Sequence, residues 1–136
     1  MALQVWLPMN NSSNMFENKG LKPCEIMMVD DYVSKSNDGK LGKCLSFDGE
    51  EGCLYADNSP LNNNTEEFSF CCWVRKKDEA GGCLFTNRTT ITDQAISIFL
   101  ESTILFDDGV RWSFTPSINV TVNKWVHVCF TRKKGV

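Results

Sequence analysis

The chain has 136 residues, 42% of them hydrophobic, and a formal net charge of −3 at pH 7. This length predicts a single domain spanning residues 1–136 that can bury a core without disulfides. The acidic balance excludes nucleic acid as the expected partner, because a phosphate-binding surface needs clustered Lys and Arg. The short basic runs at 75–77 and 132–134 are predicted to be solvated strand ends.

The first residues contain neither a basic segment nor an apolar stretch long enough for export, and no later segment is long enough for a membrane helix. We therefore expect synthesis in a cytoplasm and no membrane insertion. An odd number of cysteines leaves at least one without a disulfide partner. Most of them lie in apolar alternations, where a thiol behaves as a small hydrophobe, so we expect buried thiols. The seven are Cys24, Cys44, Cys53, Cys71, Cys72, Cys83 and Cys129.

The first half of the chain contains short strand signals separated by polar loops. Residues 3–7 alternate weakly and stop at Pro8, which reads as a strand end. Residues 10–19 form a polar loop that ends at Gly20. Residues 24–33 fit either a strand or a short helix, because periodicity does not separate the two. Residues 34–40 are expected to form a loop.

Two apolar-polar alternations flank the turn signal Asp48-Gly49. The first begins at Lys43 and the second follows the turn, so the pattern predicts a hairpin between them. A polar connection over residues 58–65, broken by Pro60, then leads to the densest apolar cluster of the chain.

Residues 68–74 read as the central strand. Because side chains alternate between the two faces of a strand, Phe68 and Phe70 share one face with Cys72 and Val74. Ser69 and Cys71 share the other face with Trp73 and Arg75. The first set is expected to face a core. The second set places one large aromatic side chain, that of Trp73, among polar groups. Such a face suits either a second small core or the floor of a ligand groove.

The remaining segments continue the strand pattern. Residues 82–86 form a strand, and residues 95–101 alternate with Ile98 and Phe99 on opposite sides. Residues 103–106 pair with 110–114 across Asp107-Asp108-Gly109. The last strand, 125–132, turns Val126, Val128 and Phe130 inward. Strands at near-regular spacing without a convincing amphipathic helix predict an all-β antiparallel β-sandwich or jelly roll.

Three motifs resemble, in order and spacing, the signature of laminin-G-like, concanavalin A-like lectin jelly-roll domains of bacterial and phage proteins. They run from about residue 42 to residue 131, and residues 5–8 also resemble the first strand of that family. The motifs are Gly42-Lys43-x-x-x-Phe47-Asp48-Gly49, Phe68-Ser-Phe-Cys-Cys-Trp73-Val74 and Trp125-Val-His127-Val-Cys-Phe-Thr131.

The resemblance implies a non-enzymatic sugar-binding or adhesive module. Such domains occur in phage tail, baseplate and head-decoration proteins and in bacterial surface proteins. The start at Met-Ala without a signal peptide favours the virion, after synthesis in a bacterial host. The family continues past the Trp-x-His motif for several strands, whereas this chain stops at Val136. We therefore expect a jelly roll that lacks its C-terminal strands, and an open sheet edge that pairs with its own copies or with other virion proteins.

The sequence contains only weak signals for a catalytic site or a metal site. Glycosidases of this general fold need acidic residues spaced so that a strand aims them into one groove. Here Glu50-Glu51 and Glu66-Glu67 are adjacent, so they would face opposite ways, and His127 is expected to be a satisfied, half-buried histidine. The chain is predicted not to be an enzyme and to need no cofactor. Calcium at Asp107-Asp108 is the alternative to a plain turn.

The candidate ligand-binding residues are aromatic side chains with polar neighbours. Trp73 and His127 lie on equivalent faces of two strands that the family makes neighbours, and Trp112 could flank them. Asn87 and Arg88 could bond sugar hydroxyls. The alternative is that loops seal Trp73 and His127, in which case replacing Trp73 would cost stability more than binding.

The sequence thus favours a structural and adhesion module of a phage virion that also recognises glycans. The alternative function is a carbohydrate-binding module of a bacterial cell-surface or carbohydrate-processing protein.

Overall fold

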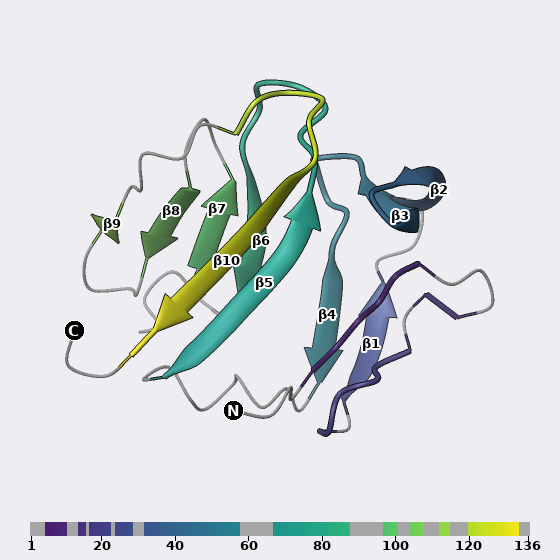
Figure 1. The fold of residues 1–136 in the computed structure, drawn as a ribbon, viewed down its shortest axis with the longest axis horizontal. Helices are drawn as coiled ribbons and strands as arrows, with labels where there is room; N and C mark the ends of the chain where they lie inside the picture. The colour runs from purple at the N-terminus through teal and green to yellow at the C-terminus, as the bar shows by residue number, and fades with distance from the viewer. Residues whose placement is uncertain are drawn as a thin grey trace. The chain divides into compact units, whose positions relative to one another are not determined.

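A computed structural model provides the fold of the chain (Figure 1). It describes residues 5–10, 14–15, 17–22, 24–28, 32–57, 67–87, 97–100, 104–107, 112–114 and 120–133. Within these ranges every regular element is a β-strand, and all strand pairs are antiparallel, which confirms the all-β prediction. The chain divides into two compact units, Met1–Asn62 and Asn63–Val136. This division does not test the prediction that residues 1–136 form one domain, which therefore remains a prediction.

The first unit contains two short sheets. Strand β1 (Glu25–Met28) pairs with β4 (Leu54–Asp57), and β2 (Val33–Gly39) pairs with β3 (Gly42–Phe47). The prediction of a loop over residues 34–40 is therefore wrong. Residues 25–28 settle the open choice between strand and helix in favour of a strand.

Two glycines make the tight turn between β2 and β3 possible. A Cβ on Gly39 would lie 2.5 Å from the carbonyl oxygen of Lys43, so the backbones approach too closely for any side chain. Gly42 has a φ of 104°, a conformation that L side chains rarely adopt. These positions allow a polar segment with few core-facing residues to pair as a ribbon.

The predicted hairpin across Asp48-Gly49 is also wrong, although a turn forms there. Asp48 Oδ1 accepts hydrogen bonds from the backbone N–H groups of Glu50 (3.0 Å) and Gly52 (3.1 Å). The N–H of Asp48 donates to the carbonyl oxygen of Tyr32 at 3.1 Å. This contact ties the end of β3 back to the start of β2, so the two strands that flank the turn pair with β2 and β1 instead of with each other.

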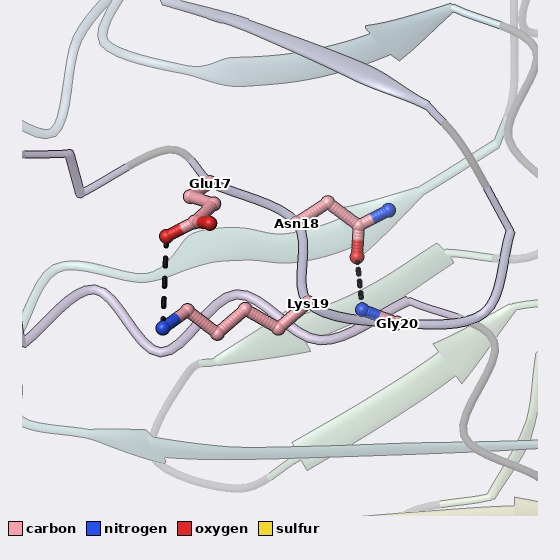
Figure 2. A network of polar contacts seen from close by, with 4 residues as sticks. All are labelled: Glu17, Asn18, Lys19 and Gly20. Atoms are coloured by element: carbon pink, nitrogen blue, oxygen red, sulfur yellow. Dashed lines mark hydrogen bonds and ion pairs between the residues drawn. The ribbon is translucent and has the colours of Figure 1, made fainter.

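Asn18 organises the loop that precedes β1. Its Oδ1 accepts the N–H of Gly20 at 2.8 Å, as Figure 2 shows, and the N–H of Trp6 at 3.0 Å. The carbonyl oxygen of Trp6 accepts the N–H of Lys19 at 2.8 Å. Trp6 therefore bonds to this loop, and residues 5–7 do not form the predicted strand; residues 3 and 4 lie outside the described part. The exposed ion pair between Lys19 Nζ and Glu17 Oε2, which are 3.6 Å apart, is drawn in Figure 2; it adds little stability because solvent screens it.

The second unit contains a two-stranded ladder and a four-stranded sheet. Strand β5 (Phe68–Val74) pairs along its whole length with β10 (Val126–Arg132), the long teal and yellow arrows of Figure 1. The sheet has the order β6-β7-β8-β9. Its strands are β6 (Gly82–Thr86), β7 (Ser97–Leu100), β8 (Ile104–Asp107) and β9 (Trp112–Phe114). The predicted pairing of these two segments is confirmed, since β8 pairs with β9, but the register differs: Asp107, predicted to lie in the turn, belongs to β8 and pairs with Trp112.

An apolar interior joins the ladder to the sheet. Burial along β5 alternates strictly, with Phe68 only 5% exposed, which confirms the predicted core face. The rings of Phe68 and Phe130 lie 5.5 Å apart between centroids on that face, and Val128 is 4% exposed. Phe70 contacts Phe85 of β6 with ring centroids 5.3 Å apart. These contacts pack the ladder against the first strand of the sheet.

Candidate functional site

The candidate site is the exposed face of the β5–β10 ladder, called the outer face below. Three pairs of directly opposite residues form it: Ser69 with Thr131, Cys71 with Cys129, and Trp73 with His127. All six are exposed, while the residues between them turn inward. The prediction that Trp73 and His127 lie on equivalent faces of neighbouring strands agrees with this register.

Trp73 and His127 form an aromatic pair at one end of the outer face. Their ring centroids are 5.1 Å apart and the rings are tilted by 50°. Trp73 keeps 44% of its surface exposed. The alternative that loops seal Trp73 is therefore wrong, and His127 is exposed instead of half-buried. Directly opposite side chains on antiparallel strands are close enough to interact, which explains the pairing.

A cation–π contact between Arg75 and Trp125 lies just beyond the aromatic pair, where β5 ends and β10 begins. The guanidinium carbon of Arg75 lies 5.1 Å from the ring centroid of Trp125, at cation–π distance. The neighbouring Lys76 is only 5% exposed, so the prediction of a solvated basic run is wrong at this position. Its Nζ donates to the carbonyl oxygen of Glu79 at 3.3 Å, and its own carbonyl oxygen accepts the N–H of Asn123 at 2.8 Å. Sequence reasoning missed this lysine because a charge run gives no sign of which member turns inward.

Two thiols lie side by side at the centre of the outer face. Cys71 and Cys129 are directly opposite each other. Hydrogen bonding toward Cys129 raises the pKa of Cys71 to about 11, with smaller contributions from burial and from the charge of Cys129. The thiol form of Cys71 therefore dominates at neutral pH. The two hydroxyl groups beside this pair, on Ser69 and Thr131, are 3.1 Å apart.

The expectation of buried cysteines is wrong for most of them. Cys53, Cys71, Cys83 and Cys129 are exposed, and Cys24, Cys44 and Cys72 are partly buried. Alternation along a strand explains this result, because a cysteine within an apolar run still falls on either face. Cys72 faces the interior, and burial, followed by the charge of Cys71, raises its pKa to about 11.

Two of the other predicted site residues lie in or next to the four-stranded sheet. Trp112 belongs to β9, at the opposite edge of that sheet from β6, and Asn87 directly follows β6. Arg88 lies outside the described residues. Asp108, one of the two carboxylates considered for calcium, also lies outside them. Of the five candidates, the structure thus brings Trp73 and His127 into direct contact.

Comparison of the chain with protein-family models, with curated proteins and with solved structures finds no match. In the part of the chain that the structure describes, no helix is long and apolar enough to cross a membrane. The same residues contain no group of three or more His, Cys, Asp or Glu side chains placed to hold a metal ion.

Proposed function

We propose that this chain is a non-enzymatic adhesion module that recognises glycans through the outer face of its β5–β10 ladder. The observation that carries the proposal is the exposed Trp73, whose ring contacts that of His127, its register partner on the fully paired neighbouring strand. An exposed aromatic side chain on a rigid strand, with a second ring beside it, favours contact with a partner.

The chemistry of this pair suits a sugar. The electron-rich face of an indole ring attracts the apolar C–H face of a pyranose, while nearby polar groups bond its hydroxyls. His127 supplies a ring nitrogen beside Trp73, and Arg75 at the end of the strand supplies donors. A broad, exposed face of this kind suits binding better than bond cleavage, which requires converging acids in a groove.

The finer fold and the setting are part of the same proposal. We take the second unit as part of a concanavalin A-like jelly-roll sandwich, supported by the Phe70–Phe85 contact between the ladder and the sheet. The setting in a phage virion, or on a bacterial cell surface as the alternative, is supported by the three sequence motifs that resemble laminin-G-like domains.

Association with copies of itself or with other virion proteins belongs to this setting. Within the described ranges each sheet of the first unit has two strands, and two-stranded sheets are marginal alone in water. Large apolar side chains of the same unit are exposed, among them Leu21 at 70% and Leu41 at 69%. We expect light scattering to show an oligomer of the purified chain; a well-folded monomer at micromolar concentration would contradict the association.

Replacing Trp73 by Ala tests the glycan site. A glycan array first identifies a ligand, and titration then compares the variants. We expect Trp73→Ala to weaken binding about 30-fold or more, since a central aromatic contributes about 2 kcal/mol when fully engaged. The same change should cost less stability than truncating a buried aromatic residue, because Trp73 keeps 44% of its surface exposed.

Tyr55→Ala is the matched control, because Tyr55 is an aromatic residue of similar exposure (48%) in β4 of the first unit. It should leave glycan affinity unchanged. An array with no bound glycan, or a Trp73→Ala variant that binds as tightly as the wild type, would refute the proposed site.

A further inference from the structure

The centre of the outer face holds a pair of thiols that glycan recognition does not use. Cys71 and Cys129 are exposed and directly opposite each other on antiparallel strands. The contacts on both sides fix this register: the Ser69 and Thr131 hydroxyls at 3.1 Å, and the Trp73 and His127 rings at 5.1 Å. The ladder therefore places the two thiols across from each other on one exposed face.

We propose that Cys71 and Cys129 form a redox-active dithiol, which closes into a cross-strand disulfide by exchange with a low-molecular-weight disulfide such as oxidised glutathione. The inference is independent of the glycan site, because it needs only the thiol pair and its register.

The exchange proceeds in two steps. Cys129 loses its proton to solvent and its sulfur attacks one sulfur of oxidised glutathione, whose S–S bond breaks, and the first glutathione leaves as a thiolate that takes up a proton. Cys71 then loses its proton to solvent and attacks the sulfur of Cys129, and the second glutathione leaves in the same way. Two protein thiols and one oxidised glutathione thus give one protein disulfide and two glutathione thiols, with two electrons passing to glutathione.

The raised pKa of Cys71, about 11, keeps this thiol protonated at neutral pH and disfavours it as the first nucleophile. Once Cys129 carries glutathione, the position of Cys71 directly across the ladder favours the second step.

We expect this disulfide to be readily reduced. Directly opposite residues of an antiparallel pair commonly have Cβ atoms about 4.5–5.5 Å apart, whereas a relaxed disulfide needs about 3.5–4.5 Å. Closing the bond is therefore expected to strain the ladder, and strained disulfides are the more easily reduced ones. Cys72 does not compete, because it faces the interior on the opposite side of β5.

Peptide mapping of the full chain tests the pair. The reduced protein is incubated with oxidised glutathione, its remaining thiols are blocked, and it is digested without reduction by trypsin and a glutamate-specific protease. We expect mass spectrometry to find peptide 68–75 joined to peptide 125–132 through Cys71, and dithiothreitol to release them. The exposed Cys53 and Cys83 are internal controls, which should carry glutathione without an internal link.

Two variants separate this pair from general thiol reactivity. Cys129→Ala should abolish the linked peptides, and Cys72→Ala should keep them. The proposal is overturned if the wild-type chain carries glutathione on both Cys71 and Cys129 without a link. It is equally overturned if the link runs through Cys72, or if a non-reducing gel shows that the disulfide joins two chains.

Discussion

Phe68→Ala is expected to lower the free energy of unfolding by about 3–5 kcal/mol, the range for a truncated core phenylalanine. Phe68 is 5% exposed and begins the inner face of β5, where its ring lies 5.5 Å from that of Phe130 between centroids. Removing the ring leaves a cavity between the paired strands, because the backbones of a fully bonded ladder cannot close around it. Denaturant unfolding followed by circular dichroism measures the loss.

Phe47→Ala is the matched control, because Phe47 is the same residue type at 40% exposure in β3. We expect it to change stability by less than about 1 kcal/mol. Amide hydrogen exchange provides a local measurement: Phe68→Ala should accelerate exchange in β5 and β10 and leave β2 and β3 unchanged. Equal losses from both variants would show that the inner face of β5 is not a core.

Ile98→Ala is expected to cost about 2–5 kcal/mol, and Ile98→Val about 0.5–1.5 kcal/mol. Ile98 has 0% exposure, and it lies in β7, which has a paired strand on each side. Its register partners are Phe85 of β6 and Phe106 of β8. A neighbour on both sides restricts collapse around the lost atoms, so the loss should grow with the volume removed. The same unfolding measurement checks this graded series.

Leu41→Ala provides the control for Ile98, because Leu41 is 69% exposed in the turn after β2. It should change stability by no more than about 0.5 kcal/mol. Ile98→Val and Ile98→Ala variants that both unfold like the wild type would contradict the buried position of β7.

The sequence predicted the second unit better than the first, for a physical reason. Strands β5 and β10 bury one face, so their apolar residues recur with period two and identify both the strands and their inward sides. Strand β2 has no such signal: it reads Val-Ser-Lys-Ser-Asn-Asp-Gly, and only Val33 in it is buried. Its pairing depends on the close approach at Gly39, which a pattern of hydrophobic residues does not encode.

Strand partners were harder to predict than strands. Asp48-Gly49 does form a turn, with Gly49 at a φ of 90°, but the contact from Asp48 to Tyr32 sends β3 back to β2. A local turn signal specifies the direction of the chain over a few residues. Which strand lies beside which is decided by contacts distant in sequence, and these are visible only in the folded chain.

The candidate site could be predicted only in part, because it also depends on contacts between strands that are distant in sequence. Alternation placed Trp73 and Cys71 together on one face of β5, and the family resemblance placed His127 on a neighbouring strand. The exact opposition of Cys71 and Cys129 depends on the register between strands 58 residues apart along the chain (129 − 71). Exposure of Trp73 also depends on what covers the ladder, which alternation does not determine.

The adjacent cysteines Cys71 and Cys72 of β5 make the register between β5 and β10 measurable. A slip of one residue along β10 would turn the phenylalanine side to water and set Cys72, instead of Cys71, across from Cys129. Identifying which sulfur can be bridged to Cys129 would therefore distinguish correctly aligned molecules from misaligned ones in a single preparation, without any added label.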